Sequence, residues 1–223
     1  MVDFPYAVHW TDVAFQLVGQ AASAGFGLSG ASINVASNSG HWVADVSFLI
    51  RTEDQYFGWQ GFIAEMRGTV GTTVVPCRQR YLPFDGQARR MNGLGAVDFG
   101  GSSFPDTSGL GQSTTIHAEL AAPASLRDGV ISVRYLDTTG LRPGHYITIG
   151  ENLHQVITAH ETAPDVYAIQ IEPLIRQAYP ALERVVLDRP HCRMRMLEPG
   201  QGVIGASISR VDRFSVRFVE DVR

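Results

Sequence analysis

The chain has 223 residues, a formal net charge of -4 and two cysteines. A chain of this length buries roughly 70% of its unfolded surface, so its core needs no disulfides, and the acidic balance argues against a nucleic-acid binder that works by neutralising phosphates. Cys77 and Cys192 lie far apart in the sequence, and neither has a second cysteine or histidine at zinc-ligand spacing. We therefore expect two free thiols, with a disulfide between them as the alternative.

The amino terminus predicts where the protein is made. It lacks the basic and then apolar run of a signal peptide, and no apolar window approaches the roughly 18 residues that a membrane span needs. We therefore expect a protein without a membrane span that is made in, and stays soluble in, a cytoplasm.

All 18 basic residues are arginine. A GC-rich genome explains this, and a preference for bidentate pairing at interfaces is the alternative.

The first part of the chain predicts a strand, an arm and a second strand. Residues 13–18 alternate apolar and polar side chains, and the small-residue stretch at 19–32 cannot hold a helix, which favours an extended or looping arm. Residues 41–50 alternate again, as in a half-buried strand. The apolar face of that strand consists of Trp42, Ala44, Val46, Phe48 and Ile50.

The hydrophobic period changes between residues 55 and 68. Trp59, Phe62, Ile63 and Met66 are spaced as i, i+3, i+4 and i+7, which places them on one helix face, and Gly68 stands where a glycine ends a helix. We predict the only substantial helix here. Its aromatic stripe is expected to form core rather than a cofactor site, because one face of a lone helix must pack on a sheet.

Beyond the helix, residues 71–76 predict a third strand. Residues 77–128 are rich in Gly, Ser, Asp and Pro without a sustained period, so we expect a long loop there, with one strand at residues 113–120. Near the carboxyl end, residues 207–219 alternate apolar and polar side chains. They are predicted to form a last strand that rejoins the amino-terminal sheet.

Residues 140–197 carry the pattern of a small β-barrel. Strands are predicted at residues 146–149, 153–158, 166–171 and 185–187, with turns at 150–152 and 163–165. The first two strands are close enough to form a tight hairpin, and Pro190 ends the last one. No acid, base or nucleophile dominates this stretch, which favours a structural role.

No motif for catalysis or for a bound cofactor stands out. A GxSxG nucleophile motif is missing, and the glycine-rich pieces at 93–95 and 109–111 match neither a phosphate-binding loop nor a dinucleotide turn. None of the seven histidines lies at metal-ligand spacing, namely His9, His41, His117, His145, His154, His160 and His191. The acidic candidates, which the sequence gives no reason to pair, are Asp45, Asp54, Glu65, Glu151, Glu172 and Glu183. We predict no catalytic, cofactor-binding or metal-binding residue and no enzymatic activity.

Five motifs follow one another along the chain: GHWVADVSF, FGWQGFIAEMRG, RPGHYITIGENLHQVI, YAIQIEPLIR and DRPHCRMRML. Their order resembles that of the distal-tail-type minor tail proteins of long-tailed, siphovirus-like bacteriophages. In that family a tryptophan strand precedes a short helix that ends in Leu-Arg-Gly, which is matched by Met-Arg-Gly at residues 66–68. A family hairpin is matched at residues 144–156, and two later elements at 171–176 and 190–196. The departures are Ile175, which stands before Arg176, and Met196, which replaces a leucine.

The resemblance implies a structural virion protein at the tail tip. It implies a homo-oligomer, a hexameric ring that joins the tail tube protein to the hub protein of the baseplate and supports tail fibres and host attachment, without direct contact to nucleic acid. Residues 1–128 plus 200–223 would form a β-sandwich or barrel ring domain with one short α-helix, and residues 129–199 an inserted small β-barrel domain. We expect residues 19–32 and 93–112 to be interface arms that neighbouring subunits order.

Two other classes of function stay open. In one, the small barrel is a carbohydrate-binding or host-wall-hydrolysing module of the tail. Exposed tryptophans on the barrel would favour sugar binding by stacking, but Trp10, Trp42 and Trp59 all lie outside residues 129–199. In the other, the chain is a cellular enzyme domain with dispersed catalytic residues. A perturbed carboxylate or histidine in a deep pocket would favour that alternative.

Overall fold

The computed structural model describes residues 1–5, 8–19, 21–26, 32–36, 40–79, 83, 118–135, 140–204 and 212–222. The chain divides into two compact units. Unit 1 consists of Met1–Arg78, Glu151–Leu153 and His191–Arg223, and unit 2 consists of Gln79–Gly150 and His154–Pro190. Strands dominate both units, and the described residues contain one helix. The prediction of a mainly β fold with a small barrel is confirmed.

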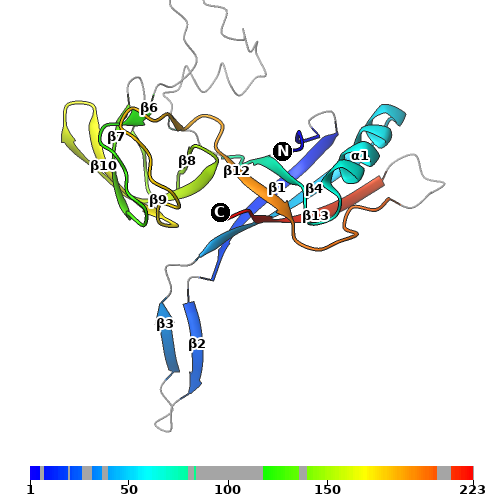
Figure 1. Cartoon of the computed structure of the whole chain (residues 1–223), viewed down its shortest axis with the longest axis horizontal. Helices are drawn as coiled ribbons and strands as arrows, with labels where there is room; N and C mark the ends of the chain where they lie inside the picture. Colours follow the sequence, from blue (N-terminus) through cyan, green and yellow to red (C-terminus); the bar gives the residue numbers. More distant parts are fainter. Residues whose placement is uncertain are drawn as a thin grey trace, which may run out of the picture. The chain divides into compact units, whose positions relative to one another are not determined.

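A five-stranded antiparallel sheet forms the centre of unit 1. Its strands, in sheet order, are β1 (His9–Val18), β4 (His41–Ile50), β13 (Asp212–Glu220), β12 (His191–Met196) and β5 (Thr72–Pro76) (Figure 1). The alternation predicted for residues 41–50 is confirmed, because all five side chains of its apolar face are buried. The last strand of the chain, β13, rejoins the amino-terminal sheet as predicted, directly beside β4.

Helix α1 (Glu53–Met66) begins and ends with ordinary capping chemistry. The Thr52 hydroxyl accepts a hydrogen bond from the Gln55 backbone N–H at 3.3 Å, and Glu53 and Asp54 place negative charge in the first turn. At the other end Arg67 is left-handed, with φ of 47°, and Gly68 follows with φ of 70°. The predicted helix and its glycine stop are therefore confirmed.

The aromatic stripe of α1 forms the core of unit 1. Trp59, Phe62 and Met66 are buried, and the Trp59 ring lies 4.6 Å from the Phe48 ring and 4.8 Å from the Phe214 ring, measured between centroids. Large apolar rings of this kind dominate the energy of a small core. The helix therefore packs on β4 and β13, as expected of a lone amphipathic helix beside a sheet.

Strand β12 corrects one expectation. The sequence assigns residues 191–196 to the barrel, but they pair with β13 and β5 in the sheet of unit 1. Cys192, Met194 and Met196 alternate as buried residues along β12. Alternation of this kind fits any half-buried strand, so it could not show which sheet the strand would join.

Strands β2 (Ala21–Phe26) and β3 (Ser32–Ala36) form a separate two-stranded sheet (Figure 1). They pair with each other from Ala21 opposite Ala36, and no further described strand pairs with either. The arm predicted at residues 19–32 is thus, where the structure describes it, part of a hairpin. The second predicted arm, residues 93–112, lies outside the described residues.

Unit 2 is a small barrel. Its strands, in sheet order, are β11 (Val185–Val186), β8 (Tyr146–Ile149), β9 (Asn152–Ala163), β10 (Val166–Glu172), β7 (Val130–Tyr135) and β6 (Ala118–Leu120). The two ends of this sheet meet, because the Leu120 N–H donates to the Glu183 carbonyl at 2.9 Å and the Leu182 N–H donates to the Leu120 carbonyl at 2.8 Å. This near closure removes the exposed edges that an open sheet would leave.

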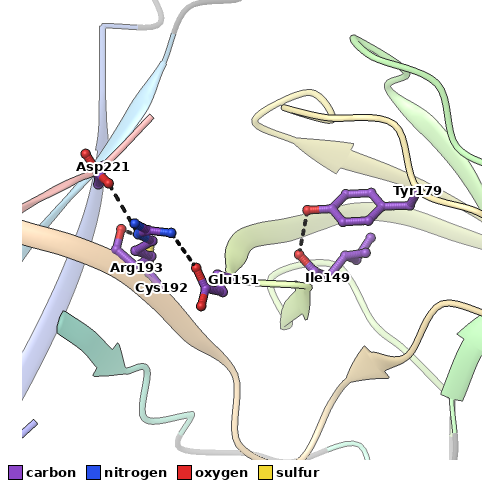
Figure 2. Close-up of polar contacts among 6 residues, drawn as sticks. All are labelled: Ile149, Glu151, Tyr179, Cys192, Arg193 and Asp221. Carbon is purple, nitrogen blue, oxygen red and sulfur yellow. Dashed lines mark hydrogen bonds and ion pairs between the residues drawn. The ribbon is translucent and has the colours of Figure 1, made fainter. Parts of the chain in front are cut away.

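Apolar side chains from every strand fill the barrel. The largest fully buried ones in unit 2 are Leu120, Ile147, Ile149, Ile169, Ile171 and Ile175. The Tyr179 hydroxyl donates to the Ile149 carbonyl at 2.9 Å (Figure 2). Beside it Gly150 has φ of 61°, and a Cβ atom there would lie 3.1 Å from the Tyr179 ring. The turn predicted at residues 150–152 therefore needs its glycine.

The boundaries of the two units differ from the expected domains at three points. Unit 2 includes β6, because this strand completes the barrel, so it begins well before residue 129. It ends at Pro190 rather than at residue 199, because β12 belongs to the other sheet. Residues Glu151–Leu153 belong to unit 1, where the Arg193 N–H donates to the Glu151 carbonyl at 2.9 Å.

Candidate assembly interface

The outer edge of β1 is an open sheet edge in the part of unit 1 that the structure describes. β1 stands at the end of its sheet and pairs with β4 alone among the described strands. A bulge interrupts the ladder between Trp10 and Asp12, and residues 13–18 after it carry no charged side chain. Exposed edges are usually blunted by charge, proline or distortion. None of these devices protects residues 13–18.

Apolar side chains line this edge. Val13, Phe15 and Leu17 lie opposite Val46, Ala44 and Trp42 of β4, on the face that carries the core. Their β4 partners are fully buried, whereas these three are only half-buried. Among the described residues, the edge therefore combines backbone groups that pair with no strand and apolar side chains that remain partly accessible.

The opposite edge of the sheet is partly covered. The Val2 N–H donates to the Thr72 carbonyl of β5 at 2.7 Å, and Val2 forms a parallel bridge with Thr73. Pro76, at the end of β5, has no backbone N–H to offer. The two edges of unit 1 therefore differ in their capacity to accept another strand.

The β2–β3 hairpin is the second surface without a partner. A two-stranded hairpin is marginally stable in water, and a third strand or a packed face is usually needed. β2 and β3 have neither a third strand nor more than slight contact with other elements in the part of the chain that the structure describes.

Charged groups near the end of the sheet are paired. Arg193 places Nη1 2.8 Å from Glu151 Oε2 and Nε 3.2 Å from Asp221 Oδ2 (Figure 2). Its side chain is only 18% exposed. One arginine that pairs with two carboxylates offsets part of their charge and fixes their positions, which is the arrangement expected of a structural network rather than of an acid and a base. Arg193 and Asp221 are not among the predicted site residues, because residues so far apart in the sequence carry no spacing signal.

The six histidines that the structure describes do not gather into one site. His9 and His160 are exposed, His41, His145 and His191 are half-buried, and His117 lies outside the described residues. His154 is fully buried in unit 2, where its Nδ1 lies 2.7 Å from the Pro173 carbonyl oxygen. Since a carbonyl only accepts, Nδ1 carries the proton. Burial, with a smaller effect from Arg176, lowers the pKa of His154 to about 4.

Neither cysteine is placed for nucleophilic chemistry. Cys77 and Cys192 are both buried free thiols. Burial raises the pKa of Cys77 to about 12, so its reactive thiolate form is suppressed. The expectation of two free thiols is confirmed.

The carboxylates considered from sequence are dispersed. Asp45 pairs with Arg217 at 2.9 Å and Glu151 with Arg193, while Asp54 and Glu65 lie on α1. Glu172 ends β10, and Glu183 lies in unit 2. Within the described ranges, no three or more His, Cys, Asp and Glu side chains are grouped so that they could hold a metal ion.

The aromatic residues that could stack on a sugar are mostly committed to other contacts. Trp42 and Trp59 are buried in unit 1, and Trp10, half-buried on β1, has the Arg78 guanidinium 3.8 Å from its ring centroid. In unit 2 Tyr135 stacks on Tyr167 with centroids 4.2 Å apart. Burial raises the pKa of Tyr135 to about 12.

Neither a family model nor a curated protein matches the sequence. The resemblance to distal tail proteins therefore stays a prediction from its motifs. In the part of the chain that the structure describes, no helix is long and apolar enough to cross a membrane.

Proposed function

We propose that the chain is a structural virion protein of a bacteriophage tail tip. In this proposal it is one subunit of a closed ring, with six copies, that joins the tail tube to the hub and supports receptor-binding parts. It acts by assembly and not as an enzyme. The observation that carries the proposal is the uncharged edge of β1 at residues 13–18, which no described strand covers.

The β2–β3 hairpin supplies what that edge lacks. No described strand pairs with the outer backbone groups of β1, and no described strand adds a third to the hairpin. If the hairpin of one subunit pairs with β1 of the next, the β1 edge gains backbone hydrogen bonds and the hairpin gains a third strand. Each added backbone hydrogen bond contributes roughly 0.5–1.5 kcal/mol, and burial of Val13, Phe15 and Leu17 adds to this.

This pairing is heterologous, since each subunit gives one surface and receives on another. Heterologous contacts produce closed rings when the rotation between subunits closes. Because Val2 partly covers the β5 edge, β1 is the better of the two sheet edges to accept a strand from a neighbouring subunit. The order of the sequence motifs supports a tail-tip ring in particular.

Labelling on the particle tests the location. Gold-conjugated antibodies against the purified chain are expected to mark one end of the tail in electron micrographs of the phage that encodes it. Particles without label, alongside free chain in the host lysate, would rule out a virion role.

A matched pair of substitutions tests the edge. Gln16→Lys places a charge on the exposed side of β1, and Gln170→Lys places the same charge on β10, which has a neighbour on both sides. We expect Gln16→Lys to weaken self-association about tenfold or more and Gln170→Lys to leave it unchanged. Equal association of both variants would contradict the assignment of β1 as the acceptor.

A further inference from the structure

A groove lies between the amino-terminal segment and α1 in unit 1. It has a volume of about 410 Å³ and is lined by Asp3, Phe4, Pro5, Val8, Gly58, Gly61, Phe62 and Glu65. Phe4, Val8 and Phe62 are buried and apolar. The carboxylates of Asp3 and Glu65 are exposed, and neither forms an ion pair with a described residue. The groove is therefore apolar inside and acidic at its rim.

Two glycines keep the helix side of the groove open. Gly58, Gly61 and Glu65 lie on one face of α1, and a Cβ atom at either glycine would meet nothing within 4 Å. Each glycine inside a helix is less favourable than alanine, and here neither relieves a clash with any residue that the structure describes. Their smallness leaves room for something from outside.

A turn in unit 2 presents the complementary chemistry. Leu126 is 58% exposed and Arg127 is exposed beside it. The turn is well fixed: the Ser125 N–H donates to Asp128 Oδ2 at 2.6 Å, and the Arg127 N–H donates to the Ile175 carbonyl at 2.8 Å. Arg127 has φ of 70° and makes no ion pair with any described residue.

We propose that the Leu126–Arg127 turn of a second copy of the chain docks in this groove. Leu126 fills the apolar interior against Phe4 and Phe62, and the Arg127 guanidinium meets the carboxylates of Asp3 and Glu65. Among exposed leucines at left-handed turns, Leu182 offers no such match, because Glu183 follows it and would meet an acidic rim. The inference rests on the proposed self-association and adds a second contact to it.

Cysteine cross-linking between two preparations tests the contact. Gly61→Cys and Leu126→Cys chains are mixed under mild oxidation, and the native cysteines do not interfere because both are buried. We expect a disulfide-linked dimer that contains one chain of each kind. Leu182→Cys mixed with Gly61→Cys is the matched control and is expected to give none.

Charge reversal gives an independent measurement in the full chain. Glu65→Arg and Arg127→Glu are each expected to weaken self-association about tenfold, and the two together to restore most of it. Chains that associate normally but neither cross-link nor respond to reversal would overturn the docking and leave the ring standing. Chains that do not associate at all would overturn the proposed ring as well.

Discussion

The indole of Trp42 donates its Nε1 proton to the carbonyl oxygen of Leu153 at 2.7 Å, between residues 111 positions apart in the sequence. Trp42 is 1% exposed, and its backbone N–H donates to the buried carboxylate of Glu220 at 3.0 Å. A buried polar group must find a partner or cost free energy. This bond explains why residues 151–153 belong to the sheet unit although their neighbours on both sides do not.

Replacement of Trp42 by phenylalanine removes this donor and leaves the Leu153 carbonyl without it. We expect the free energy of unfolding of unit 1 to fall by about 2–4 kcal/mol, from the lost bond and the smaller ring. Chemical denaturation followed by circular dichroism measures it. Trp10→Phe is the control, and because Trp10 is only half-buried the loss should be smaller.

Substitution of Arg193 by methionine tests the carboxylate network. Glu151 and Asp221 would keep their charges without the arginine that pairs them, so we expect a loss of about 2 kcal/mol in the free energy of unfolding. Arg217→Met breaks an ion pair of similar length whose partners are about half exposed. It is expected to cost clearly less than Arg193→Met, because water screens an exposed pair. Equal losses would mean that the Arg193 network adds nothing beyond a surface pair.

Two neighbouring glycines separate backbone strain from steric clash. Gly200 and Gly202 both have positive φ, of 81° and 73°. A Cβ atom at Gly202 would lie 2.6 Å from the Trp59 ring, whereas at Gly200 it would meet nothing within 4 Å. We expect Gly200→Ala to cost about 1 kcal/mol and Gly202→Ala about 1–3 kcal/mol more. Thermal unfolding of the two variants, side by side, measures the difference.

His154 predicts acid sensitivity of unit 2. Its pKa is lowered to about 4 in the folded protein, by burial first and then by Arg176, against 6.5 for an ordinary histidine. The unfolded chain therefore takes up a proton at higher pH than the folded chain. Stability from this group is fully present above about pH 6.5 and falls as the pH drops toward 4, by roughly 3 kcal/mol in total.

Denaturation across this pH range, with His154→Asn as the comparison, checks the assignment. Asparagine keeps a donor near the position of Nδ1 but does not titrate, so the variant should be less stable at pH 7 and show a flatter fall. His160→Asn, at an exposed position, should keep the full slope. An unchanged slope in His154→Asn would show that other groups cause the acid sensitivity.

The local pattern of apolar residues predicted the helix and several strands correctly. It could not predict which strands pair with one another. The spacing of Trp59, Phe62 and Met66 predicted α1, and the alternation of apolar residues predicted β4. Each of these patterns lies within a single element, so it can be seen without knowledge of the element's partners. The sequence assigns residues 191–196 to the barrel with their neighbours and does not predict a strand of the other sheet there, because a period of two is the same in a barrel and in a sheet. Which edge stays open depends on which strands pair, so the sequence of β1 alone could not reveal it.

The groove beside α1 could not be predicted from the sequence either. Gly58 and Gly61 are visible in the sequence only as weak points in a helix. Only the folded structure shows that they line a groove, because the amino-terminal segment with Asp3 and Phe4 lies beside them.

The mass of the purified chain in solution, measured by analytical ultracentrifugation over a wide range of concentration, tests the proposed ring most directly. A closed ring predicts a discrete species of six chains that does not grow further as the concentration rises, and that in Gln16→Lys forms only at concentrations about tenfold higher or more. A chain that stays monomeric at every concentration, or that forms filaments of unlimited length, would contradict it.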